Sequence, residues 1–285
     1  MGCSQRVSSD EALTHAAVAR PNAPRACVGA AAERDLDCAV MHAGSVVFLS
    51  DAHLGAQAHE REAAREARLH GFLAALPGRA STLYIVGDLF DFWFEYRTAI
   101  PRRHFRTLAA LERLRDAGVG IVYLNGNHDF WLGTFLTETL GIRTVSGAVE
   151  VAEQGRRLWV HHGDGLVGGD LGYRMLRAVL RHPASIRAYQ WLHPDLGIPL
   201  AHAVSDWSRR SRAQPLLEPE RLWNEIAKPR FAEGYDAVII GHFHHAYERR
   251  EAGREFFLLG DWIERFSYLE LREGKLALQT WSAPE

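Results

Sequence analysis

The stretch "DAVIIGHFHH", residues 236–245, joins the pattern of a buried strand to a cluster of histidines. Its apolar run ends at a glycine, after which His242 and His244 follow two positions apart. Side chains two apart on an extended backbone point the same way, so this stretch predicts a ligand pair at a strand end. One histidine alone would indicate little, so the rest of the chain has to supply partners for the pair.

The bulk composition fits one large globular domain, or one domain with an insertion. The 285 residues are 47% hydrophobic and 24% charged, with a net charge of −2, which is ordinary for globular proteins and gives no general attraction to nucleic acid. No run of eighteen apolar residues occurs, so no transmembrane helix is predicted. Cys3, Cys27 and Cys38 are the only cysteines, which makes a disulfide framework unexpected and is compatible with a reducing cytosol.

The first residues differ in pattern from the rest of the chain. They lack the apolar stretch of a signal peptide, and Arg6 stands where a myristoylation signal carries serine or threonine. We expect residues 1–42 to be a disordered N-terminal extension and residues 43–285 to form one domain. An alternative is that Met41 is the natural start.

Short runs of β-branched and aromatic residues recur along the domain, each with the length of a strand and bounded by glycine. Residues 59–76 and 103–118 have the apolar stripe of helices, so the alternation favours an α/β domain. The tail, residues 267–281, alternates with period two around Glu-Gly and predicts a closing hairpin. Besides 236–245, the strand-like runs are residues 45–53, 82–91, 120–129, 157–164 and 255–262.

Residues 165–230 have a helical periodicity that Pro183, Pro194 and Pro199 interrupt. We interpret this segment as a helical lid inserted over the active edge of the sheet. The alternative is a connecting helix pair that only packs on the core. Its apolar residues alternate with arginines. This pattern is typical of a helix at a membrane interface, and equally of a helix that packs on the core and exposes a basic face.

Metal-type side chains follow five of these runs, at the strand ends where α/β sheets bind ligands. Each residue alone could be a helix cap, a turn residue or a hydrogen-bonded histidine of the core. Five such groups at the ends of five successive strands are hard to explain by packing. Oxygen and nitrogen ligands without thiolate suit Mn²⁺, Fe or Zn²⁺, and they are too many for one ion. The residues are Asp51, His53, Asp88, Asp91, Asn127, His128, Asp129, His161, His162, Asp164, His242 and His244.

The order of these motifs resembles the calcineurin-like metallophosphoesterases over residues 45–262. The resemblance implies an α/β (α+β) fold, a four-layer metallophosphoesterase β-sandwich flanked by helices, with two divalent metal ions. We expect Mn²⁺, with Fe or Zn²⁺ as alternatives. The motifs are "DAH" 51–53, "GDLFD" 87–91, "GNHD" 126–129, "HGD" 162–164 and "GHFH" 241–244.

The resemblance also implies a role for each ligand residue. Asp88 would bridge the two ions and activate, with them, a water that attacks phosphorus. His128, beside a ligand, would protonate the leaving group or stabilise the transition state, and Asp91 would orient it. The first ion would be held by Asp51, His53 and His244, the second by Asn127, His162 and His242.

Three neighbouring polar residues stay outside the ligand set. His161 should point away from His162 on a strand. The alternative role for Asp129 is that of a helix cap. The alternative role for Asp91 is that of a surface turn residue.

Four further stretches are similar to the UDP-2,3-diacylglucosamine pyrophosphohydrolases (diphosphatases) of lipid A biosynthesis. The similarity implies cleavage to UMP and 2,3-diacylglucosamine 1-phosphate, with the insertion as a lid over an acyl-chain groove. The implied substrate contacts are Asn127, His128, Tyr173, Arg209 and Arg212. The stretches are "DLFDFWFEY" 88–96, "HGDGLVGGDLGYR" 162–174, "LHPDLGIPLAH" 192–202 and "WSRRSR" 207–212.

One position leaves alternatives open. Many of those hydrolases carry arginine where this chain has His128, so a soluble phosphomonoester, phosphodiester or nucleotide remains an alternative substrate, and a non-enzymatic scaffold a third reading. We expect a UDP-sugar lipid substrate, a transient contact with the inner-membrane surface, no nucleic acid and no obligate protein partner. The expected location is cytoplasmic, peripheral on the cytoplasmic face of the inner membrane.

Overall fold

The computed structural model describes residues 44–56, 59–166, 175, 178–211 and 218–282. The expected extension over residues 1–42 lies outside these ranges, as do Tyr173, Arg212 and the side chain of Arg209.

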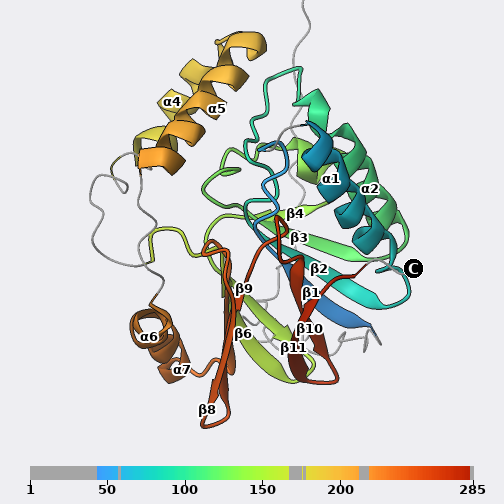
Figure 1. Cartoon of the computed structure of the whole chain (residues 1–285), viewed down its shortest axis with the longest axis vertical. Helices are drawn as coiled ribbons and strands as arrows, with labels where there is room; N and C mark the ends of the chain where they lie inside the picture. Colours follow the sequence, from blue (N-terminus) through green and yellow to red (C-terminus); the bar gives the residue numbers. More distant parts are fainter. Residues whose placement is uncertain (1–43, 57–58, 167–174, 176–177, 212–217, 283–285) are drawn as a thin grey trace, which may run out of the picture. The chain divides into compact units, whose positions relative to one another are not determined.

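A six-stranded sheet carries the N-terminal and C-terminal strands of the domain (Figure 1). Its order is β11-β10-β1-β2-β3-β4, in which β1 to β4 run parallel and β10 and β11 form an antiparallel pair. The closing hairpin is confirmed: its two turn residues, Glu273 and Gly274, have φ of 52° and 74°, as a type I′ turn requires. The strands are β1 (Ser45–Leu49), β2 (Ala80–Val86), β3 (Gly120–Leu124), β4 (Arg143–Val145), β10 (Ser267–Arg272) and β11 (Lys275–Thr280).

A second, five-stranded sheet has the order β5-β6-β7-β9-β8. Strands β6, β7 and β9 run parallel, and β5 and β8 pair antiparallel at the two edges. The strands are β5 (Val149–Glu153), β6 (Arg156–His161), β7 (Ala237–Ile240), β8 (Ala246–Glu251) and β9 (Arg254–Leu259).

The two sheets bury one apolar layer between them. Alternate residues of β1, Val46 and Phe48, belong to this layer together with Val160 and Ile239 of the second sheet. The other residues of β1, among them Leu49, point to the opposite face, as the period of two in a strand requires. The domain is therefore a β-sandwich.

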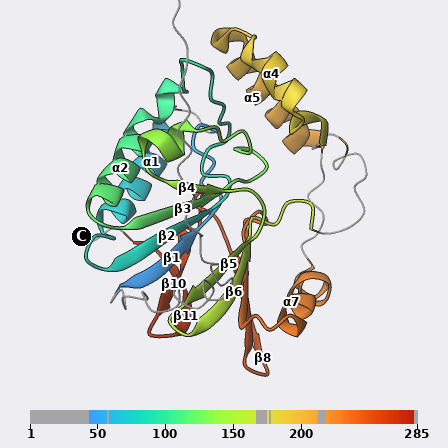
Figure 2. The ribbon, with the colours of Figure 1, turned by 180° about the vertical axis from the view of Figure 1, so that it is seen from behind.

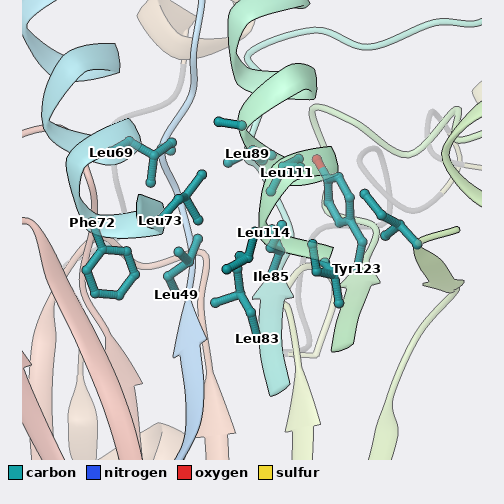
Figure 3. Close-up of a cluster of buried hydrophobic side chains, with 14 of the residues drawn as sticks. Leu49, Leu69, Phe72, Leu73, Leu83, Ile85, Leu89, Leu111, Leu114 and Tyr123 are labelled. Atoms are coloured by element: carbon teal, nitrogen blue, oxygen red, sulfur yellow. The ribbon is translucent and has the colours of Figure 1, made fainter. Parts of the chain in front are cut away.

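Helices cover the outer face of each sheet. Helices α1 (His59–Ala74) and α2 (Phe105–Asp116) pack on the first sheet, and Figure 3 shows Leu69, Phe72 and Leu73 of α1 above Leu49. A short 3₁₀ helix, η1 (Arg102–His104), precedes α2. These layers confirm the four-layer fold expected above. On the second sheet lie α6 (Pro219–Leu222), the π-helix η3 (Trp223–Ala227) and α7 (Lys228–Ala232) (Figure 2).

The insertion contains two further helices, α4 (Pro183–Gln190) and α5 (Pro194–Ser211). The insertion contacts aromatic side chains that follow two of the motifs, through Leu180 ahead of α4 and through Tyr189 of α4. Trp131 donates from Nε1 to the Leu180 carbonyl at 3.0 Å, and the Tyr189 ring lies 4.6 Å from Phe94 and 5.0 Å from Trp131. The end of the segment differs from the expectation, because α6, η3 and α7 form the outer layer of the second sheet.

The remaining element is a π-helical turn, η2 (Phe135–Thr139), which follows the GNHD motif. Among the helices that the structure describes, none has the length and apolar character to cross a bilayer.

Candidate metal centre

The loops that follow β1 and β2 are hydrogen-bonded to each other. Asp51 donates its N–H to the Gly87 carbonyl at 3.2 Å, and His53 donates to the Asp88 carbonyl at 2.9 Å. Because β1 and β2 are parallel neighbours, both loops leave the sheet at the same edge. The first two motifs therefore form one continuous backbone platform.

Five of the expected ligand residues have left-handed backbone conformations. Such φ values are uncommon for residues other than glycine and cost about 1 kcal/mol or more each. They persist where the surrounding structure fixes a functional geometry. The residues are Asp51 (57°), His53 (42°), Asp88 (53°), His242 (70°) and His244 (52°).

These angles correct one expectation. Strand β7 ends at Ile240, and the left-handed φ of His242 and His244 means that neither residue is extended. The argument that both side chains leave one side of a strand is therefore wrong. The two histidines instead turn into two adjacent groups, one residue in each.

The motif glycines allow the loops to approach each other closely. A Cβ added at Gly126 would overlap the Asp88 carboxylate, and one at Gly241 would overlap the Ser50 hydroxyl. Any side chain at these two positions would push a motif loop away from the residue it faces. The glycine that precedes the ligand residues of "GNHD" and "GHFH" is thus required by packing.

The first group consists of Asp51, His53 and His244. The His53 Nε2 atom lies 3.2 Å from His244 Nε2, and both lie near Asp51 Oδ1, at 3.6 and 3.5 Å. Asp51 Oδ1 is buried and has no hydrogen-bond partner among the described residues. A carboxylate oxygen and two imidazole nitrogens that converge in this way could hold one divalent ion.

The second group consists of Asp88, His162 and His242. His162 Nε2 lies 3.3 Å from Asp88 Oδ2 and 3.1 Å from the Asn127 side-chain oxygen. Its other nitrogen, Nδ1, donates to the Val86 carbonyl at 2.9 Å, which leaves Nε2 free of hydrogen as a ligand atom in the neutral ring. This group could hold a second ion.

Asp88 joins the two groups. The oxygen that lies 3.3 Å from His162 Nε2 also lies 3.5 Å from His53 Nε2 in the first group. The other oxygen accepts a hydrogen bond from the His128 backbone N–H at 2.8 Å. One carboxylate thus contacts both groups, which is the position of a bridging ligand.

The carboxylates draw positive charge toward the centre. Burial disfavours the charged ring of His53, but Asp51 and Asp91 raise its pKa to about 10. The pKa of His162 is likewise about 10, because Asp88 outweighs burial there. Burial, together with charged His162, lowers the pKa of His242 to about 4. Divalent cations would supply the same positive charge and leave these rings neutral as ligands.

Asp91 and His128 lie next to each other beside the first group. His128 Nδ1 is 3.0 Å from the Asp91 carbonyl oxygen and 3.4 Å from its carboxylate. The Asp91 carboxylate is also 3.6 Å from His53 Nδ1. Asp91 is buried, so the alternative of a surface turn residue is wrong.

Asp129 has a role that the sequence did not indicate. It is buried and accepts hydrogen bonds from the N–H groups of Gly126 at 2.8 Å and Asp88 at 3.2 Å, and from the Tyr123 hydroxyl. Burial and the Asp88 charge raise its pKa. Asp129 therefore ties the loops after β2 and β3 together and does not cap a helix. The sequence feature that pointed to Asp129 was its position at the end of the GNHD motif.

The residues around the HGD motif divide as expected. His161 points away from His162: its ring stacks on Trp159, 5.5 Å between centroids, and its Nδ1 accepts from the Gly163 N–H at 2.8 Å. Asp164 is buried and lies 3.5 Å from the guanidinium of Arg181.

Arg181, in the insertion, is a second residue whose role the sequence did not indicate. Its guanidinium donates to the Gly126 carbonyl at 3.1 Å and lies over the Phe130 ring at 5.2 Å. A positive charge from the insertion thus lies beside the loops of Asn127 and His162.

Arg65 is the third such residue. It comes from α1, is buried, and donates to the Ala52 carbonyl and, at 3.4 Å, to the His53 carbonyl. It also pairs with Glu62 at 3.4 Å, and Glu62 accepts from the Gly55 N–H at 2.6 Å. Two side chains of α1 therefore fix the backbone of the first motif loop.

Replacing Arg65 with methionine should weaken binding of one Mn²⁺ ion by about 10- to 100-fold, as for other groups that orient ligands. The double variant E62Q/R65M avoids an unpaired buried carboxylate, and Arg65→Lys should recover part of the loss. Mn²⁺ titration calorimetry with a melting curve for each variant checks this. Unchanged affinity for both ions in a folded R65M protein would contradict it.

Comparison with known proteins gives consistent relatives. The model of the calcineurin-like phosphoesterase family matches residues 44–246. A protein of Porphyromonas gingivalis named UDP-2,3-diacylglucosamine hydrolase is 32% identical over 241 residues, covering 78% of this chain and 92% of the relative. A protein of the same name from Stenotrophomonas maltophilia is 30% identical and covers 83% and 98%. The solved structure of Yfce, a phosphoesterase from E. coli, covers 83% of this chain and 92% of its own, with a TM-score of 0.41 and 17% identity.

Proposed function

The chain belongs to the calcineurin-like phosphoesterase family, and from this premise we propose that it hydrolyses UDP-2,3-diacylglucosamine at its pyrophosphate. The products are UMP and 2,3-diacylglucosamine 1-phosphate. The observation that carries the proposal is the pair of ligand groups joined by Asp88, next to an insertion with exposed apolar side chains. Relatives named for this substrate align over most of the chain.

Seven residues would hold two divalent ions. Asp51, His53 and His244 would hold the first, Asn127, His162 and His242 would hold the second, and Asp88 would be shared by both. When bound, the ions supply Lewis-acid charge and activate a water for attack on phosphorus. The mixed oxygen and nitrogen donors suit Mn²⁺, with Fe or Zn²⁺ as alternatives.

The chain's own side chains would bind the substrate and move a proton. His128 Nδ1 lies 3.0 Å from the Asp91 carbonyl oxygen and 3.4 Å from the Asp91 carboxylate. Both groups accept a hydrogen bond, so Nδ1 would carry the proton and Nε2 would exchange a proton with the leaving group. The Asp91 carboxylate holds that ring in place. Asn127 and Arg181 supply a polar and a charged contact for phosphate oxygens.

Tyr173, Arg209 and Arg212 complete the proposed substrate contacts, on the resemblance of their stretches to the lipid A hydrolases. They would bind the phosphosugar from the insertion.

The lid would receive the acyl chains and contact the inner-membrane surface. Several large apolar side chains of the insertion are exposed, among them Trp191 at 88% and Leu196 at 64%. Leu196 and Leu200 lie one helical turn apart on α5 and so share a face. Such surfaces bind lipid chains or membranes. The proposed location is therefore peripheral, on the cytoplasmic side of the inner membrane.

Trp191→Glu should lower kcat/KM for the diacylated substrate about tenfold, since burying such a side chain contributes roughly 1.5–3 kcal/mol, and should leave a soluble phosphodiester unaffected. The side chain is 88% exposed, so the fold should tolerate the change. Ala184→Glu, which adds the same charge at an exposed position of α4, is the control. An equal loss of kcat/KM on both substrates would contradict the assignment of the insertion as a lid.

A soluble phosphoester or nucleotide is the second candidate, favoured by His128 at the position where many lipid A hydrolases carry arginine. Purified protein with Mn²⁺ is given UDP-2,3-diacylglucosamine, UDP-N-acetylglucosamine and bis(4-nitrophenyl) phosphate in parallel, and UMP and nitrophenol are quantified. UMP from the diacylated substrate alone supports the proposal. Turnover of the soluble esters with the lipid ignored would replace it with the second candidate.

A further inference from the structure

The segment "RTAIPRRHFR", residues 97–106, concentrates positive charge on a chain whose net charge is −2. It holds four arginines and no acidic residue. Arg97, Arg102, Arg103 and Arg106 are all exposed. The attraction to an anionic partner is therefore local to this segment, because the molecule as a whole is slightly acidic.

Phe105 adds an exposed aromatic ring to the same segment. It is the first residue of α2 and is 70% exposed, while the buried residues of that helix begin at Thr107. A large apolar side chain between Arg103 and Arg106 is costly in water and serves no packing in the core. Exposed aromatic residues flanked by arginines are typical of surfaces that enter the headgroup region of a membrane.

The segment borders both the metal centre and the lid. Its preceding residue, Tyr96, lies 6.3 Å from the Tyr189 ring of α4. The Arg103 guanidinium carbon is 3.1 Å from the position of a Cβ on Gly55, in the loop that follows His53. An acid that faces the segment is Glu66 of α1: burial and Glu62 raise the pKa of its carboxyl, and Arg103 and Arg106 act in the opposite direction.

We propose that residues 97–106 form a docking surface for anionic phospholipid headgroups, with Arg97, Arg102 and Arg106 on phosphates and Phe105 in the interface. The proposal rests on the proposed function, because a lipid substrate has to reach the centre from a membrane. Each arginine near an anionic surface strengthens binding roughly fivefold. The exposed ring of Phe105 among the arginines favours a lipid surface over an acidic protein or nucleic acid.

Vesicle cosedimentation of the full chain tests this surface. Phosphatidylcholine vesicles are compared with phosphatidylcholine–phosphatidylglycerol vesicles at low and high salt. Wild type should bind only the anionic vesicles, less at high salt. R102Q/R106Q should bind roughly 25-fold more weakly, at about fivefold per arginine, and Phe105→Ser should also bind more weakly. The control R143Q/K275Q removes two exposed positive charges from β4 and β11 and should bind like wild type.

Three outcomes would overturn the proposed docking surface. They are no vesicle binding by wild type, an equal loss of vesicle binding in the control, and binding of heparin through the same arginines without binding of vesicles. Turnover of detergent-dispersed UDP-2,3-diacylglucosamine separates this proposal from the proposed function. R102Q/R106Q should keep wild-type turnover there. If the chain binds vesicles through these arginines but releases no UMP, the proposed function is refuted and the proposed docking surface is retained.

Discussion

Asp88→Asn should lower hydrolysis of UDP-2,3-diacylglucosamine at least about 1000-fold, since the charge stabilisation supplied by a metal centre is worth several kcal/mol. Asp88 Oδ2 contacts His53 and His162, one residue of each group. Despite burial, the neighbouring histidines hold the pKa of Asp88 well below its usual range, so the group is a carboxylate. Asparagine removes that charge and cannot bridge two cations.

The readouts are the initial rate and the number of Mn²⁺ ions per chain after desalting. Asp88→Asn keeps the size of the side chain and an oxygen that can accept from the His128 N–H, so the fold should survive. Asp116→Asn, at the exposed end of α2, is the matched control. A variant with a wild-type rate and two ions would show that Asp88 does not bridge them.

His128→Ala should lower kcat by about 10²–10⁴-fold, the range for loss of a general acid, with both ions still bound. A ring nitrogen of His128 lies within ligand spacing of His53 and Asp88, but the side chain is not in the proposed ligand set, and it contacts Asp91 and the His53 ring. Metal content should therefore separate this variant from Asp88→Asn.

A change of leaving group sharpens the test of His128. The phosphate that leaves in the proposed reaction has a pKa of about 6, whereas a phenol has a pKa of about 10 and needs the proton more. The His128→Ala defect should therefore grow for a phenyl ester of UMP. His128→Gln should behave like alanine, because the amide cannot donate an acidic proton. An equal defect for both leaving groups would assign His128 to binding instead of proton transfer.

The sequence predicted the strands that carry the motifs because their patterns are strong. Each strand-like run is rich in β-branched or aromatic residues and bounded by glycine, and each forms a strand in the structure. These strands are β1, β2, β3, β6, β7 and β9. The edge strands β4, β5 and β8 had no such signal. β8, "AYERRE", has only intermediate and exposed residues, so its partner β9 and not its own pattern makes it a strand.

The candidate centre could be predicted as a set of residue types at strand ends, but not as a geometry. The periodicity of a strand implied that His242 and His244 share a side, whereas their φ values of 70° and 52° turn them into different groups. A periodic pattern carries no information on left-handed residues. Arg65 was missed, and so was the role of Asp129, because both depend on contacts with backbone groups distant in the sequence.

The insertion shows a further limit of patterns. A helix with an apolar stripe can pack on a sheet or leave part of that stripe exposed, and both occur between residues 165 and 230. The stripe of α6 and η3 packs against the second sheet through Leu222 and Trp223, whereas Trp191 and Leu196 of the preceding helices are exposed. Only the tertiary contacts distinguish the two.

The most direct test of the two-metal account is a titration of Mn²⁺ into chelator-stripped protein while UMP release from UDP-2,3-diacylglucosamine is measured. The account predicts that the rate rises until two ions are bound per chain. It also predicts that one equivalent leaves most of the activity missing. A rate that is complete at one ion per chain, or that does not depend on Mn²⁺, Fe or Zn²⁺, would contradict it.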